Sequence, residues 1–310
     1  MNKVLVVRAI MAALLVMLPV VAVATPSNEM DQKLAALIAA ENALPYGADP
    51  GPPLREVYAS EFGAFKIDDL HGLSDYDLRL YLRASKTLAF YTFDRKYLER
   101  VGIAFSELES RGIVTQHDFS SLFDTYIQFR DLVGAGALAE RHAEFEHQPL
   151  PRFTGFDREF SGPTVLVLED DGSISRLPAG LAAEGPQVVV AGHPLCHFSE
   201  NAIRFIDKDE QLAAMFAGRT LWLMPQDGDL NLDVVAEWNR QFPDYAMRWA
   251  YQTSDWPMIK RWATPNFYFY RDGKLVTTVI GWPPEGQRDA LISAFKEIGV
   301  ERGAPAQRSR

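Results

Sequence analysis

The sequence predicts an α/β domain in the second half of the chain, preceded by an all-α domain. Between residues 73 and 145 the apolar positions recur with a period near 3.6, which is typical of amphipathic helices. After the proline-containing stretch 148–152, short apolar runs of strand length alternate with helical patterns, which favours α/β layers. The 310 residues suffice for two domains at about 100–200 residues each.

Residues 1–24 are predicted to be a signal peptide outside the fold. Lys3 and Arg8 form a positive start, an apolar run follows over 9–18, and Ala22-Val23-Ala24 resembles a cleavage site. The alternative is an uncleaved membrane anchor, but the apolar stretch is shorter than the roughly 20 residues that span a bilayer. We therefore expect an exported, periplasmic protein that has no membrane span after cleavage.

The charge and the cysteine content exclude several function classes. The formal net charge is −10 and the chain has no basic block, so nucleic acid is not expected as a partner. Cys196 is the single cysteine, which excludes an intramolecular disulfide and a cysteine-rich metal site. Any thiol chemistry must therefore pass through one sulfur, and no cofactor is expected.

The helical domain is predicted over 25–150. It should begin with one helix at 31–42, followed by a linker at 45–53 whose prolines and glycines oppose helix formation. Ser74 and Asp94 have the side chains of helix N-caps, so helices are expected to run from them to Thr92 and to Gly112. Two more helices are expected over 116–132 and 134–146.

These four expected helices form two hairpins. Their turns, Phe93-Asp94-Arg95 and Phe129-Arg130-Asp131, lie 36 residues apart, close to the 34-residue unit of tetratricopeptide repeats. Most consensus positions of that repeat are missing, so a plain helical bundle is an equal alternative. Either arrangement offers a surface for a protein partner.

The α/β domain is predicted over 153–300, and a disordered tail over 301–310. Turns are expected at Asp170-Asp171-Gly172 and at Asp272-Gly273. Strands are expected over 164–168, 174–177, 188–191, 220–224, 245–250, 267–270 and 275–280, and helices over 196–217, 232–242, 256–262 and 286–298.

Two local motifs in this domain resemble the thioredoxin superfamily. The buried strand at 188–191 runs into Gly192-His193-Pro194-Leu195-Cys196-His197-Phe198-Ser199, where a helix begins. Downstream, Ala263-Thr264-Pro265-Asn266-Phe267 leads into a hairpin. The hairpin at 164–177 and the extra strand–helix segment before Pro265 resemble the TlpA-like and peroxiredoxin-related branch. The resemblance covers about 162–300 and implies a central mixed sheet flanked by helices.

The resemblance also implies roles for individual residues. Cys196 lies where the family keeps its nucleophilic cysteine, and Ser199 lies where dithiol members keep the resolving cysteine. Thr264 precedes Pro265, which matches the cis-proline that faces the sulfur. Two departures, Val190 in place of a buried acid and Leu195 in place of a tryptophan, are typical of a monothiol (Cys-x-x-Ser) variant that does not resolve its own mixed disulfide.

The chemistry of these positions supports a reactive thiol. A cysteine at a helix N-terminus is favoured as thiolate by the helix dipole, and His197 can add positive charge. The alternative is an inert buried cysteine. Ser199 cannot attack a disulfide, and its alternative role is that of a helix-start residue that bonds a backbone N–H.

Three functions therefore remain open from the sequence. The first is thiol–disulfide exchange through mixed disulfides of Cys196 with protein or small-molecule thiols, with Ser199, His197, Thr264 and Pro265 at the site. The second is a non-catalytic binding or adaptor module. The third is periplasmic copper handling by His193, Cys196 and His197, which have the residue types of metal ligands.

Overall fold

The computed structural model describes residues 29–45, 48–259 and 262–301. The predicted signal peptide lies outside the described residues, as does the predicted tail beyond Glu301. The described part of the chain contains no helix that is long and apolar enough to cross a membrane.

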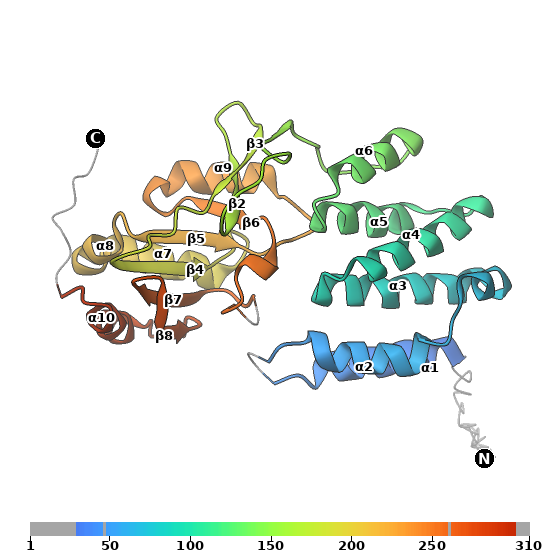
Figure 1. The fold of residues 1–310 in the computed structure, drawn as a ribbon, viewed down its shortest axis with the longest axis horizontal. Coiled ribbons are helices and arrows are strands. Elements are labelled where there is room, and N and C mark those ends of the chain that lie inside the picture. The colour runs from blue at the N-terminus through green and yellow to red at the C-terminus, as the bar shows by residue number, and fades with distance from the viewer. Residues whose placement is uncertain (1–28, 46–47, 260–261, 302–310) are drawn as a thin grey trace, which may run out of the picture.

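The N-terminal part is helical, as predicted. Its elements are α1 (Glu29–Asn42), α2 (Gly51–Phe62), the 3₁₀ turn η1 (Ile67–Gly72), α3 (Asp75–Thr92), α4 (Arg95–Ser110), α5 (Gln116–Gln128) and α6 (Leu132–Arg141). Successive helices pack as three hairpins, α1 with α2, α3 with α4 and α5 with α6 (Figure 1). Ser74 and Asp94 cap α3 and α4 through their side-chain oxygens, as expected from the sequence.

The linker predicted over 45–53 is wrong at its C-terminal end. Helix α2 already begins at Gly51, and Pro52 and Pro53 lie in its first turn. Proline is tolerated there because the N–H groups of the first turn have no intrahelical partner. The sequence pattern therefore concealed a helix, and with it the first of the three hairpins.

The C-terminal part is a mixed sheet with helices, which confirms the predicted fold class. Its elements are β1 (Phe153–Thr154), β2 (Thr164–Leu168), β3 (Ile174–Pro178), β4 (Pro186–Ala191), α7 (His197–Lys208), α8 (Glu210–Phe216), β5 (Thr220–Met224), α9 (Leu232–Gln241), η2 (Pro243–Tyr245), β6 (Met247–Ala250), η3 (Thr253–Asp255), β7 (Asn266–Arg271), β8 (Lys274–Ile280) and α10 (Arg288–Glu297).

The strand order in this sheet is β1-β3-β2-β6-β5-β4-β7-β8. Strands β4, β5 and β6 are parallel, whereas the hairpin β7–β8 runs antiparallel to β4. The carboxyl ends of the three parallel strands therefore lie at one edge of the sheet, where ligands bind in α/β folds.

Two helical predictions in this part need correction. The single helix expected over 196–217 is divided at Asp209, whose carboxylate caps α8 by accepting the Leu212 N–H at 3.0 Å. The helix expected over 256–262 does not form in the described residues of that range. Trp256 and Ile259 are instead buried from a turn, on the sheet face opposite to the helices.

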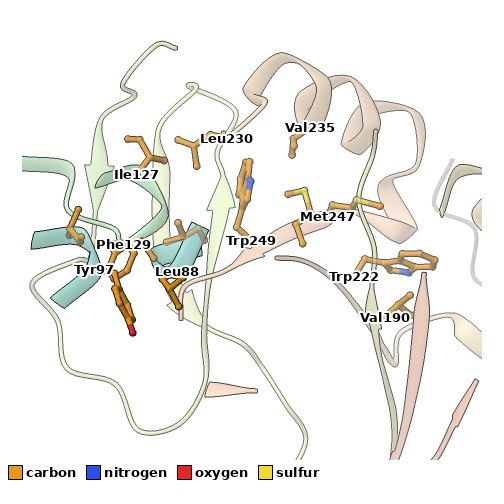
Figure 2. Close-up of a cluster of buried hydrophobic side chains, with 14 of the residues drawn as sticks. Leu88, Tyr97, Ile127, Phe129, Val190, Trp222, Leu230, Val235, Met247 and Trp249 are labelled. Atoms are coloured by element: carbon orange, nitrogen blue, oxygen red, sulfur yellow. The ribbon is translucent and has the colours of Figure 1, made fainter. Parts of the chain in front are cut away.

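One hydrophobic cluster extends through both parts of the molecule. It contains residues of α3–α6 together with residues of β4–β6 and α7–α10. Figure 2 shows Ile127 and Phe129 from the helical part in the same cluster as Leu230 and Trp249 from the α/β part. The two parts consequently share buried apolar surface, and Figure 1 shows α5 directly beside the sheet end.

Candidate functional site

Cys196 occupies the N-cap of α7, directly after the turn that follows β4. Gly192 begins this turn. A Cβ atom at Gly192 would lie 3.1 Å from the Trp222 ring, so a residue without a side chain lets the backbone pass closely over the tryptophan. The Cys196 N–H then donates to the His193 carbonyl at 3.0 Å, which closes the turn. The sulfur is thereby placed at a helix start, at the carboxyl edge of the sheet.

The loop before β7 lies against this sulfur. The Cys196 thiol donates to the backbone carbonyl of Thr264, with Sγ and O 3.3 Å apart. The Thr264–Pro265 peptide bond is cis. Residues 68 positions apart in the chain therefore lie together at one place in the fold.

The surroundings of the sulfur favour the thiolate. Burial alone raises the pKa of the Cys196 thiol. Hydrogen bonds from the Thr264 side chain and from the backbone N–H and hydroxyl of Ser199 outweigh that effect, and the Phe198 N–H adds to them. The pKa of Cys196 therefore lies below its ordinary value, because donors stabilise the negative sulfur.

Ser199 is a buried residue of the site and forms hydrogen bonds there. It is fully buried, and its hydroxyl oxygen accepts the His193 N–H at 3.3 Å. The serine thus connects the turn before Cys196 to the first turn of α7. This is the backbone-bonding role considered for it from the sequence, combined with a direct effect on the sulfur.

The ring of His193 is held at both nitrogens. Nδ1 accepts the Leu195 N–H at 3.1 Å, so this nitrogen carries no proton. The proton is then on Nε2, which lies 3.4 Å from the Asp227 carboxylate. Asp227 follows β5, so His193 connects the turn of Cys196 to the neighbouring strand end.

The metal site considered for His193, Cys196 and His197 is not formed. Both nitrogens of His193 already contact protein groups. His197 is exposed, and its ring lies against that of Phe198 with centroids 3.8 Å apart. In the chain segments that the structure describes, no three His, Cys, Asp or Glu side chains are placed to hold a metal ion.

The helical part reaches this site through Arg130, which lies in the turn between α5 and α6. Its buried guanidinium donates to the backbone carbonyl oxygens of Ala250 at 2.9 Å and of Asp227 at 3.3 Å. Burial lowers the pKa of Arg130 to about 10, although the nearby charge of Asp227 opposes this. Arg130 therefore joins the carboxyl ends of β5 and β6.

Two glutamines also hold the loop that carries Asp227. Gln226 donates to the backbone carbonyl of Gln128 at 2.7 Å. Gln148 donates to the Gly228 carbonyl at 2.7 Å and accepts the Leu230 N–H at 2.8 Å. The loop after β5 is therefore fixed by side chains and backbone of the helical part.

The sequence patterns did not indicate Asp227 or Arg130 as site residues. Arg130 did stand in a turn motif shared by two hairpins, and its φ of 58° is unusual for a residue other than glycine. That motif was the only available signal, because a single aspartate or arginine in a loop is typical of solvated surface.

Two large hydrophobic side chains near Cys196 in the chain are open to solvent. Leu195 is 62% exposed and Phe198 is 43% exposed. Beyond Phe198, a hollow of about 420 Å³ is lined by His197, Phe205 and Trp282, among others. An apolar rim of this kind suits contact with a protein partner.

Comparisons with known proteins find little similarity. No family model matches this chain, and no curated protein matches it. Among solved structures, the chain is similar to a thioredoxin-like protein from Bacteroides caccae, with a TM-score of 0.32 and 10% sequence identity. That match covers 93% of this chain and 99% of the other chain.

Proposed function

We propose that this chain is an exported monothiol protein of thiol–disulfide exchange. It acts through mixed disulfides between Cys196 and partner proteins or small thiols. The observation that carries the proposal is the position of Cys196. Its sulfur lies at the start of α7, is surrounded by hydrogen-bond donors that lower its pKa, and faces the Thr264 carbonyl. Export rests on the predicted signal peptide over 1–24.

The reaction requires one thiolate from this chain. The Cys196 thiolate attacks one sulfur of a partner disulfide, a Cys196–partner disulfide forms, and the other partner sulfur leaves as a thiolate. Ser199 stands where a second thiol would act, and no other cysteine is present. A thiol from outside the chain must therefore attack the mixed disulfide and release the partner.

The neighbours of Cys196 have distinct parts in this proposal. Ser199 and Phe198 stabilise the thiolate through hydrogen bonds, while Thr264 and Pro265 form the wall beside which a partner backbone lies. His197 is exposed at the rim and contacts Phe198.

A binding or adaptor module without turnover is the second candidate. It is favoured by the lack of a second thiol and by the apolar rim formed by Leu195 and Phe198. In that case the same surface captures partners without covalent chemistry.

Trapping of partners distinguishes the two candidates. The parent protein and the Cys196→Ser variant are exported in the same cells, free thiols are blocked, and extracts are compared by non-reducing electrophoresis. Exchange predicts adducts of the parent that disappear on reduction and are absent from the variant. Capture of the same partners by both proteins without adducts would contradict the exchange function and favour the module.

A further inference from the structure

Every polar group of His193 contacts the protein around Cys196. Its backbone N–H donates to the Ser199 hydroxyl oxygen at 3.3 Å, and its backbone carbonyl accepts the Cys196 N–H at 3.0 Å. On the ring, Nδ1 accepts the Leu195 N–H at 3.1 Å, and Nε2 lies 3.4 Å from the Asp227 carboxylate. The histidine that was considered as a metal ligand is therefore part of the turn that carries the thiol.

The hydrogen bond from Leu195 to the His193 ring closes this turn from the side chain. Nδ1 is bonded to Cγ, as is Oδ1 of an asparagine, and it accepts the N–H of the residue two positions further along the chain. An asparagine makes the same contact in an Asx turn. The ring therefore restrains the backbone from 193 to 195, and with it the position of the His193 N–H.

The position of that N–H determines where the Ser199 hydroxyl points. A hydroxyl has one hydrogen to donate, and the oxygen of Ser199 accepts the His193 N–H. The hydroxyl hydrogen is then directed to the Cys196 sulfur. Burial raises the pKa of the Cys196 thiol, and the Ser199 hydroxyl is among the donors that lower it. A displaced turn would let this hydroxyl rotate away, and the thiolate would lose one of its donors.

The Asp227 carboxylate favours the tautomer of His193 that this turn requires. A neutral imidazole has one N–H, and only the other nitrogen can accept a hydrogen bond. The carboxylate beside Nε2 attracts the N–H to that side, which leaves Nδ1 free to accept from Leu195. The side chains of His193 and Asp227 are 18% and 25% exposed, so water competes only in part with their contact. Arg130 of the helical part holds the Asp227 backbone carbonyl at 3.3 Å.

We propose that His193 is a positioning residue for exchange at Cys196 and that Asp227 selects its tautomer. The ring holds the turn, the turn directs the Ser199 hydroxyl to the sulfur, and the thiolate that attacks the partner disulfide is stabilised. Because Arg130 holds the loop of Asp227, the helical part contributes to the reactivity of the thiol. The inference rests on the proposed function, because it assigns a role in the reaction of the same site.

The rate of alkylation by iodoacetamide, measured across pH, tests the role of His193. Cys196 is the single cysteine, so the reagent reports on this sulfur alone. Leucine and asparagine have the same branched shape, but only asparagine has an acceptor in the place of Nδ1. On the acidic limb of the pH profile, His193→Leu should react about tenfold more slowly than the parent, because the rate follows the thiolate fraction and one hydrogen bond to a charged group is lost. His193→Asn should recover most of the parent rate. His117→Leu is the matched control, because His117 is exposed in the first turn of α5, and it should react like the parent.

Asp227→Leu, made in two backgrounds, separates the tautomer effect from the charge of the carboxylate. In His193→Asn the acceptor is an amide oxygen, which has no tautomer to select. Loss of the negative charge of Asp227 acts alike on the sulfur in both backgrounds. Relative to its effect in His193→Asn, Asp227→Leu should therefore slow alkylation of the parent about threefold, as for two residues coupled in one hydrogen-bond network.

Equal pH profiles of His193→Leu and the parent would overturn the inference, as would equal slowing by the leucine and asparagine variants. Equal effects of Asp227→Leu in the two backgrounds would refute the selection of the tautomer, and this comparison decides the matter even if His193→Leu does not fold. Alkylation needs no partner, so these results stand whether or not Cys196 forms adducts in cells. Adducts in cells together with an unchanged profile of His193→Leu would leave the exchange function in place and refute the positioning role.

Discussion

Arg130→Met is expected to loosen the junction between the helical part and the α/β part. The methionine keeps an apolar stem of similar length but removes every hydrogen bond of the guanidinium. That group donates to four backbone carbonyls, at Ala250, Ile127, Asp227 and Tyr251, with distances of 2.9, 3.2, 3.3 and 3.4 Å. Three of these carbonyls belong to the α/β part, so the substitution acts on the contact between the two parts.

The size of the effect follows from two opposing contributions. The two shortest hydrogen bonds, each from a charged donor, stabilise the fold by about 1.5–3 kcal/mol apiece. Burial opposes them, because it lowers the pKa of Arg130 to about 10, which corresponds to about 3 kcal/mol against the charged form. The longer bonds add to the favourable side. We therefore expect the free energy of unfolding to fall by about 2–3 kcal/mol.

Urea unfolding measures this change with two probes. All six tryptophans lie at or after position 222, so their fluorescence reports the α/β part, whereas far-ultraviolet circular dichroism is dominated by the helices. Both transitions should move to lower urea together, because the two parts share one hydrophobic cluster. The control is Arg83→Met on the exposed side of α3, for which less than about 0.5 kcal/mol is expected. Equal midpoints for the two variants would refute the role of Arg130.

Four further outcomes are expected. Alkylation of Cys196 should reach half its maximal rate below pH ~8.5, because hydrogen bonds lower the pKa of the thiol; a midpoint at or above that pH would contradict this. Because the pKa of Cys196 is lower in the folded than in the unfolded protein, the thiolate stabilises the fold at pH values above the ordinary thiol pKa. This contribution is lost as the pH falls through the pKa of Cys196 in the folded protein. The difference in the free energy of unfolding between the parent and Cys196→Ser should therefore shrink in acid. Ser199→Cys places a second thiol one helical turn from Cys196 and should create insulin reductase activity that the parent lacks, and an inactive variant would argue against the proposed resolving position. Asp227→Ala frees the His193 ring, so hydrogen exchange at the Leu195 amide should accelerate about tenfold while Val189 in β4 stays protected; unchanged exchange at Leu195 would show that Asp227 does not hold this turn.

The strand that positions Cys196 was predictable because its pattern is local. Residues 188–191 are all apolar, which is typical of a strand buried on both faces. In the structure Val188 and Val190 face one hydrophobic cluster, whereas Val189 and Ala191 face the other. The helix start at Cys196 was predictable from local sequence as well. The glycine at 192 ends the strand, and the helical pattern begins at the cysteine.

Two elements escaped prediction because local signals conflicted with packing. The prolines of 52–53 oppose a helix in its interior but not in its first turn, and α2 begins just before them. Trp256, Ile259 and Trp262 have a spacing of three that suggests a helix. In the structure Trp256 and Ile259 are buried against a sheet face from a turn, not from a helix. Packing against the apolar sheet does not require a helical backbone, so it overrides the local helical pattern.

The sequence by itself determined the fold class, the caps of α3 and α4 and the placement of a single thiol at a helix start, since each depends on residues close together in the chain. Only the tertiary structure decided what surrounds that thiol. Arg130 and Asp227 lie 97 positions apart, and nothing in either loop indicates the other. They meet because shared apolar burial docks the helical hairpins onto the carboxyl edge of the sheet.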